Sequence, residues 1–297
     1  MKRTFAFFVC IAVFTFVDFE QCTSLLPCID INNETYVTQQ WMVVVTVSHG
    51  FHEMFDNWWY HYKQLKLTMK VKMITEDALT FDRYKSIREL QVVRDDFILR
   101  TTNALNYRTR EYKKPVSKRA TYLLKEIKNG KNIIYTDIDT VWLKDPRLYL
   151  KGGFDVWASL GHWYHYCTGF VALRATSAVE CFLIEWENML QQPSLNQYVF
   201  NTLIKRSKLN HICLPEQEFP SGEMYFDRHK TVHVVVVHNN LNVGISKKRK
   251  DLSEMDCGGK TSIRCFYELS VVYVIYSNRI IIIYRKLHNI YPSLYEV

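Results

Sequence analysis

Two aspartates that directly follow an apolar stretch are the residues of this sequence best suited to chemistry. Asp137 and Asp139 come after residues 132–136, Asn-Ile-Ile-Tyr-Thr, a run typical of a buried strand. Placed two positions apart where the chain leaves a sheet, both carboxylates can point toward one site. Such oxygen ligands suit a hard divalent cation that neutralises phosphate charge. Pairs of hydrated aspartates in loops have the same spacing, so the spacing alone is weak evidence. The position directly after a strand is what favours a metal site.

A histidine and a basic cluster further along the chain could complete this site. His238 follows the apolar residues 234–237, and a neutral imidazole there could be a third metal ligand, although most histidines after strands are structural. Lys247, Lys248 and Arg249 could contact a diphosphate, and Lys247 is the strongest candidate. An ordinary hydrated charge run is the alternative, which we favour for Lys248.

Alternating strand and helix patterns must position these residues. The β-branched run 42–47 predicts a first strand buried on both faces, and a helix over 117–128 ends at Asn129-Gly130 just before the strand that carries the aspartates. Further strands are predicted at 71–75, 156–159, 169–173, 211–214 and 231–237, and further helices at 53–66, 177–189 and 197–204. We therefore predict a single α/β domain with a mixed central sheet flanked by helices, and a ligand beyond the carboxyl ends of its strands.

Several separated segments together resemble one known family. They are Asn57-Trp58, the block 135–146, Thr168-Gly169-Phe170, Asn196-Gln197 with Phe200-Asn201, the tetrapeptide 219–222, and His238-Asn239-Asn240 through Gly244 and Lys247. From about Val43 to Arg249 the sequence resembles the nucleotide-diphospho-sugar transferases of glycosyltransferase family 77, which includes plant rhamnogalacturonan xylosyltransferases. The resemblance implies a GT-A-like fold with a DxD metal site, a UDP-sugar donor, Mn²⁺ (or Mg²⁺) and transfer with retention of anomeric configuration.

The resemblance also implies roles for individual residues. The implied metal ligands are Asp137, Asp139 and His238, and Asp139 is also a candidate catalytic residue. The implied donor-binding residues, besides Asp137, are Gly169, Gly244 and Lys247. The ends of the first two strands add three positional candidates beside the nucleoside, namely Thr46, Ser48 and Asp77.

Two positions depart from the family pattern. Cys167 stands where the family has Asn before Thr-Gly-Phe, which puts sugar contacts at this position in doubt. Asn196 stands where the family has the Asp of an Asp-Gln pair, a carboxylate suited to act as nucleophile or to stabilise positive charge on the sugar. An amide does not ionise, so Asn196 can fill neither role as a carboxylate would. Either the leaving diphosphate helps the acceptor to lose its proton, or the enzyme is weakened. We retain Asn196 and Gln197 as candidate catalytic residues; the structural alternative is that both cap the following helix.

The N-terminal segment of the sequence suggests a secretory protein. Met1-Lys2-Arg3 precedes an apolar run, so residues 1–24 are predicted to be a signal peptide or a short signal anchor. Residues 25–40 would form a luminal stem, 41–256 the transferase domain and 257–297 a divergent tail, for which an additional hairpin is one option. We expect the Golgi lumen or secretion, with membrane anchorage through the N-terminal segment left open, and disulfides among some of the cysteines.

The leading hypothesis is a glycosyltransferase that moves galactose, xylose or arabinose from a UDP-sugar to a glycan or glycoprotein acceptor. The alternative is a catalytically impaired nucleotide-sugar-binding or secreted interaction protein with the same fold, supported by Asn196. The excess of 38 Lys+Arg over 30 Asp+Glu residues suits an anionic ligand. No recognised nucleic-acid-binding motif accompanies this charge, so we expect no nucleic-acid partner.

Overall fold

The computed structural model describes residues 40–95, 115–161, 165–190, 195–228, 233–240, 245–253, 271–276 and 279–284. The predicted leader at 1–24 and almost all of the predicted stem lie outside these residues. Within the described ranges, no helix is long and apolar enough to cross a membrane.

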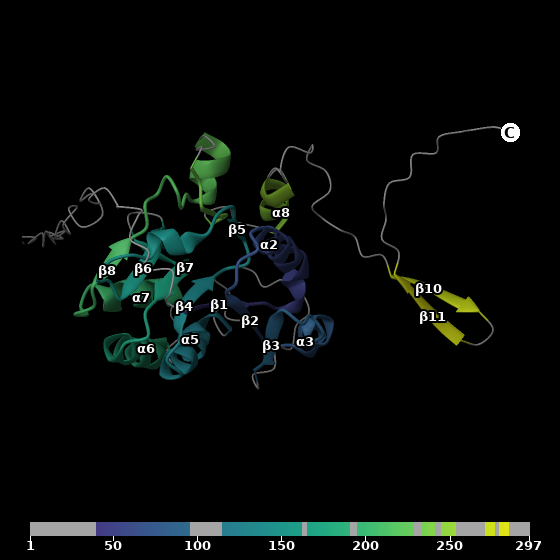
Figure 1. Ribbon diagram of the computed structural model, residues 1–297, viewed down its shortest axis with the longest axis horizontal. Helices are drawn as coiled ribbons and strands as arrows, with labels where there is room; N and C mark the ends of the chain where they lie inside the picture. Colours follow the sequence, from purple (N-terminus) through teal and green to yellow (C-terminus); the bar gives the residue numbers. More distant parts are fainter. Residues whose placement is uncertain are drawn as a thin grey trace, which may run out of the picture.

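A seven-stranded mixed sheet forms the centre of the domain (Figure 1). Its strands, in spatial order, are β3 (Leu90–Arg94), β2 (Lys70–Thr75), β1 (Trp41–Thr46), β4 (Asn132–Thr136), β7 (Tyr166–Leu173), β6 (Val156–Leu160) and β8 (His211–Cys213). β1 pairs in parallel with β2 and β4, whereas β7 runs antiparallel to both β4 and β6. The prediction of a mixed sheet is confirmed.

β1 is continuously apolar because both of its faces are covered. Val43 and Val45 belong to a core cluster with Trp58 of α2 (His52–Gln64), whereas Val44 belongs to a second cluster with Leu123 of α5 (Arg119–Lys128). Successive side chains of a strand point to opposite faces, so this alternation assigns one helix layer to each face.

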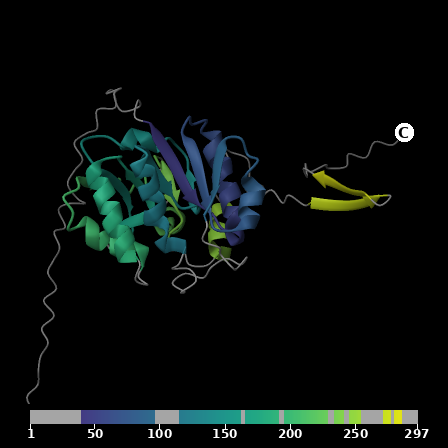
Figure 2. The same cartoon turned by 90° about the horizontal axis from the view of Figure 1, so that it is seen from below.

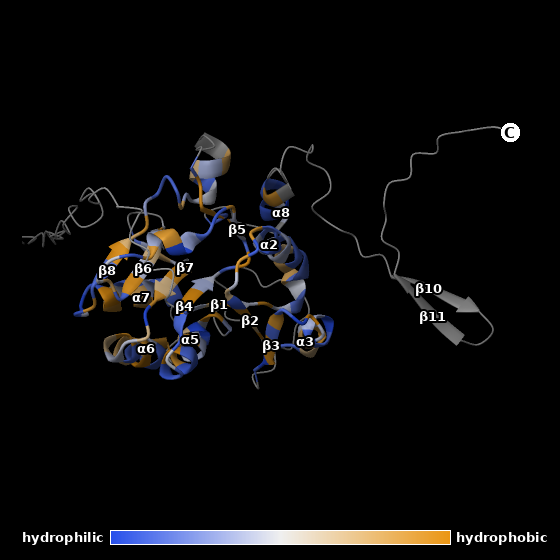
Figure 3. Cartoon of the chain, in the orientation of Figure 1, coloured by the Kyte–Doolittle hydropathy of each residue, from blue (hydrophilic) through white to orange (hydrophobic). Residues whose placement is uncertain are grey.

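The helices divide between the two faces. On the α5 face, α6 (Ser177–Leu190) lies beside α5 (Figure 1; Figure 2), and α7 (Asn196–Ile204) packs against α6. On the α2 face, the core includes residues of α3 (Ala78–Tyr84) and α8 (Ile245–Ser253). Figure 3 shows hydrophobic residues concentrated on β6, β7 and α7. The predicted helices at 53–66, 117–128, 177–189 and 197–204 are confirmed to within two residues at each end.

A small second sheet lies next to the main one and consists of β5 (Thr140–Trp142) and β9 (Val236–His238), paired antiparallel. The strand predicted at 231–237 is only partly correct, because regular pairing begins at Val236. The backbone of Val235 instead donates to Glu218 and accepts from Leu143, so it is satisfied outside a strand ladder. At its other end, β9 extends one residue beyond the predicted end at residue 237 and includes His238.

The predicted C-terminal tail contains a hairpin, one of the options that its sequence left open. β10 (Val271–Tyr276) pairs antiparallel with β11 (Arg279–Tyr284). In the described part of the chain Cys167 and Cys181 are free thiols, and disulfides among the other cysteines stay a prediction. Cys167 is enclosed within β7, while Cys181 lies on the exposed side of α6.

Candidate functional site

The turn after β4 fixes both aspartates at the edge of the sheet. The backbone N–H of Asp137 donates to the carbonyl of Gly169 on β7, with an N···O distance of 2.7 Å. The Thr140 hydroxyl then donates to the carbonyl of Asp137 at 2.8 Å, which closes a tight turn between β4 and β5. Asp137 and Asp139 therefore lie on a short connection held at both ends, as their position after an apolar strand predicts.

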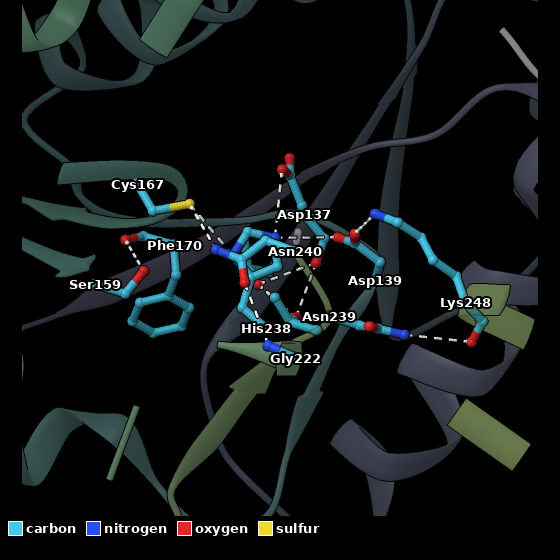
Figure 4. Close-up of polar contacts among 12 residues, drawn as sticks. Asp137, Asp139, Ser159, Cys167, Phe170, Gly222, His238, Asn239, Asn240 and Lys248 are labelled. Carbon is cyan, nitrogen blue, oxygen red and sulfur yellow. Dashed lines mark hydrogen bonds and ion pairs between the residues drawn. The ribbon is translucent and has the colours of Figure 1, made fainter. Parts of the chain in front are cut away.

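The pairing of β5 with β9 brings His238 to the aspartates. Thr140 lies opposite His238 in the register, and the N–H of Asn239 donates to the carbonyl of Asp139 at 2.9 Å. As a result, His238 Nε2 is 3.3 Å from Asp139 Oδ1 and 3.9 Å from Asp137 Oδ2. One ligand atom from each residue lies within 4.8 Å of the others (Figure 4). Two carboxylate oxygens and one imidazole nitrogen are a donor set that Mn²⁺ or Mg²⁺ can accept, so the residues fit the implied ion.

Gly169 is required by the space around this group. A Cβ atom at residue 169 would lie 2.1 Å from His238 Cε1 and 2.6 Å from Asp137 Oδ2. Gly222 has the same function beside the segment that follows β9, since a Cβ there would lie 2.6 Å from Asn239 Oδ1. Both glycines therefore permit a close approach of backbone and side chains, and Gly169 does so directly at the candidate metal site.

Two cationic side chains compensate the aspartates. Lys248 Nζ contacts Asp139 Oδ2, and an Arg119 guanidinium nitrogen donates to Asp137 Oδ1 at 2.8 Å. The interpretation of Lys248 as a solvated surface residue is wrong, because α8 turns this side chain toward Asp139. Lys247, the residue preferred from the sequence, is exposed on the same helix. The helix spacing explains the difference: Lys248 is four positions before Leu252, which is fully buried, so both share the inward face of α8.

The charges of this group stabilise one another. Burial opposes the ionised form of Asp139, but Lys248 and His238 outweigh it and hold the pKa of Asp139 well below its usual range. Burial also opposes the imidazolium form of His238, yet Cys167 and Asp139 raise the pKa of His238 to about 10. The pKa of Lys248 is raised by Asp139 in spite of its burial. In this structure the buried carboxylate is thus balanced by protonated neighbours, as buried charges require.

Thr46 is connected to the metal ligands through Tyr135. The Tyr135 hydroxyl donates to Asp137 Oδ1 at 2.9 Å and lies 3.0 Å from Thr46 Oγ1. Asp77, in contrast, caps α3: its carboxylate accepts from the backbone N–H of Thr80 at 2.7 Å and of His49 at 2.9 Å. The structure thus gives Asp77 a structural task at the end of β2, and its predicted contact with a nucleoside stays a prediction.

Ser48 follows β1 and precedes the short helix His49–Phe51. Its carbonyl accepts from the N–H of Phe51 at 2.9 Å, and its side chain makes no capping bond. Its predicted nucleoside contact also stays a prediction. Gly244 lies outside the described residues.

Asn196 starts α7 but does not cap it. The N-cap is Leu195, and Asn196 Nδ2 donates to the carbonyl of Val116 at 2.8 Å, so the capping interpretation is wrong for this residue. Asn196 is 5% exposed, and among the described residues its Oδ1 has no hydrogen-bond partner. A buried amide oxygen without a hydrogen-bond partner is available to accept from a hydroxyl group. Gln197 follows it and is half-buried.

The fold and the carboxylate turn together define a GT-A-type glycosyltransferase domain. The chain belongs to the nucleotide-diphospho-sugar transferase family, whose family model matches residues 67–252. Among solved structures, the WbbM bifunctional glycosyltransferase in its apo form has a TM-score of 0.50 and 11% identity, covering 78% of this chain and 51% of that one. This is a likeness of fold alone.

Curated relatives come from Arabidopsis thaliana. UDP-D-xylose:L-fucose alpha-1,3-D-xylosyltransferase 3 is 27% identical over 244 residues, which cover 70% of this chain and 64% of that protein. UDP-D-xylose:L-fucose alpha-1,3-D-xylosyltransferase 1 is 25% identical, with 70% and 68% covered. The matching region thus spans about two thirds of the length of these relatives.

Proposed function

We propose that this protein is a metal-dependent glycosyltransferase that takes its sugar from a UDP-sugar. The observation that carries the proposal is the convergence of Asp137, Asp139 and His238 beyond the carboxyl end of β4. Family membership supports a nucleotide-sugar donor. The relatives' names make UDP-xylose the first donor to test, with UDP-galactose and UDP-arabinose next.

In the proposed reaction, Asp137, Asp139 and His238 would hold Mn²⁺ or Mg²⁺. When bound, the ion supplies Lewis-acid neutralisation of the charge on the departing diphosphate. Arg119 keeps one Asp137 oxygen occupied, so the other would remain available to the ion. The Lys248 ammonium group would leave Asp139 and contact the diphosphate instead. Lys247 is the further candidate for this contact.

The donor sugar would lie near Gly169, Asn196 and Gln197. The unpartnered Asn196 Oδ1 is proposed to accept a hydrogen bond from a sugar hydroxyl, and Gln197 offers a second polar contact. Because Asn196 cannot act as an ionised nucleophile, we propose retention by a front-face route in which the leaving diphosphate takes the acceptor proton.

For the whole protein, we propose a glycan or glycoprotein acceptor and a location in the secretory pathway, in the Golgi lumen or outside the cell. This rests on the N-terminal sequence, with residues 1–24 as signal peptide or anchor and 25–40 as stem before the transferase domain at 41–256.

The test measures UDP release by the full-length chain from a secretory expression host. UDP-xylose, UDP-galactose and UDP-arabinose are compared with Mn²⁺ or EDTA, with and without glycan acceptors. We expect EDTA to abolish release, and Asp139→Asn to reduce it by at least about 100-fold. Asp82→Asn is the matched control, because Asp82 is an exposed carboxylate on α3 paired with Lys85. Release that persists in EDTA would contradict the metal-dependent reaction.

Asn196 favours one second candidate, a nucleotide-sugar-binding protein without turnover. That protein would bind UDP with Mn²⁺ in calorimetry yet release no UDP from any donor, and Asn196→Asp would then introduce release. If the wild-type chain turns over a UDP-sugar, this candidate is excluded.

A further inference from the structure

Cys167 contacts the imidazole of His238 from the side opposite the aspartates. The thiol lies on β7, two positions before Gly169, and is 4% exposed. Its Sγ is 3.4 Å from His238 Nδ1 and 3.6 Å from Asn240 Nδ2. Figure 4 shows Cys167 and Lys248 on opposite sides of the group formed by the aspartates and His238. The sulfur therefore touches a candidate metal ligand and the side-chain amide of Asn240.

The two ring nitrogens of His238 have different surroundings. Nε2 faces Asp139 Oδ1 at 3.3 Å, on the side where the three ligand atoms converge, whereas Nδ1 faces the sulfur. A histidine that binds a metal presents the lone pair of one nitrogen and keeps a proton on the other, and the partner of the protonated nitrogen fixes this choice.

We propose that Cys167 is a positioning residue for His238: its sulfur accepts the Nδ1–H hydrogen and so directs the Nε2 lone pair to the metal ion. This inference rests on the metal site of the proposed function. It gives a role to one of the two positions at which the sequence departs from the family pattern.

The same contacts argue against Cys167 as a metal ligand itself. Its sulfur lies at Nδ1, on the other side of the ring from Nε2, and the ligand atoms that converge in the described part of the chain belong to Asp137, Asp139 and His238. Asn240 Nδ2 donates to the sulfur as well, so the sulfur is used as an acceptor and its direction is set from two sides. The fully buried strand β7 keeps the Cys167 backbone in place.

The experiment measures Mn²⁺ affinity by electron paramagnetic resonance of the free ion, using the full-length chain. Cys167→Ala should weaken Mn²⁺ binding by about 10- to 100-fold, because the acceptor for Nδ1–H is lost. Cys167→Ser should recover most of this loss, because its hydroxyl oxygen also accepts. Cys213→Ala, a buried cysteine on β8, is the matched control and should bind Mn²⁺ within about twofold of wild type.

Equal affinities of Cys167→Ala and wild type would overturn the inference, and so would a Cys167→Ser variant as weak as Cys167→Ala. If Cys167→Ala fails to fold, nitrogen-15 NMR of histidine in the Mg²⁺-loaded wild type decides. The signal that disappears in His238→Gln should then show a proton on Nδ1 and none on Nε2, and the reverse pattern would refute the proposal.

This result is separable from that of the proposed function. A wild-type chain that binds no Mn²⁺ would refute the metal site and with it the role of Cys167. A wild-type chain that binds Mn²⁺ and is matched by Cys167→Ala would refute only the role of Cys167.

Discussion

Adding one methyl group at Gly169 should disable the metal site without unfolding the domain. In Gly169→Ala, the new Cβ would lie 2.1 Å from His238 Cε1, whereas non-bonded carbon atoms approach to about 3.5 Å. His238 or β7 must therefore shift by roughly 1.4 Å, and the contact of 2.6 Å with Asp137 Oδ2 requires a second displacement. The φ of Gly169 is not in the left-handed region, so the penalty is steric.

A misplacement of about 1 Å in a catalytic group costs roughly 100-fold in rate, or about 2.7 kcal/mol. We expect a loss of this size in Mn²⁺-dependent UDP release by Gly169→Ala, together with weaker Mn²⁺ binding in electron paramagnetic resonance. Gly153→Ala is the control, because a Cβ there has no described atom within 4 Å. Thermal unfolding monitors the fold of both variants. If Gly169→Ala keeps Mn²⁺ affinity and turnover within about threefold of Gly153→Ala, the described arrangement of His238 around Gly169 is wrong.

Three further changes test other parts of the structure. Lys248→Met should weaken UDP binding with Mn²⁺ by about 10-fold in calorimetry and more than Lys247→Met does, since both remove one charge but Lys248 contacts Asp139 whereas Lys247 is exposed; equal losses would contradict this. Arg119→Met should lower Mn²⁺ affinity by about 10-fold, because Asp137 loses a partner; unchanged affinity would exclude that role.

The third change concerns Glu76, whose pKa is raised by burial from 4.5 to about 7. The folded protein then binds this proton more tightly than the unfolded chain, so the free energy of unfolding falls as pH rises from about 4.5 to 7. The 2.5 pH units between these values, at 1.36 kcal/mol each, give up to about 3 kcal/mol. Glu76→Gln should remove this pH-dependent fall in the free energy of unfolding, measured with urea. Parallel pH profiles of Glu76→Gln and wild type would refute the prediction.

The aspartate turn could be predicted from the sequence because its determinants are local. Residues 132–136 are an apolar run that starts just after a helix-ending Asn-Gly pair, and β4 has the predicted bounds. β3 was not predicted, since it is an edge strand whose residues are half-buried or exposed at four of five positions and therefore give a weak apolar pattern. The register of β5 with β9 was also beyond prediction, because it depends on pairing between segments far apart in the chain.

The inward direction of the Lys248 side chain likewise could not be predicted from the sequence. A run of four basic residues has no apolar period of its own, so the sequence does not reveal which lysine faces inward. That direction is set by the packing of Leu252 in the core on the α2 face. The hydrogen bond of Asn196 to Val116 likewise depends on how α7 packs, which helix-capping preferences do not contain.

The pairing of β5 with β9 has a thermodynamic consequence. Asp139 and His238 lie roughly a hundred positions apart in the chain, so an unfolded chain offers no preformed site and an ion bound to all three ligands stabilises the native state alone. At a free-ion concentration 100 times the dissociation constant, this linkage would add about 2.7 kcal/mol to the free energy of unfolding. The metal supply of a compartment would then set how much of the chain stays folded there as well as how fast it works.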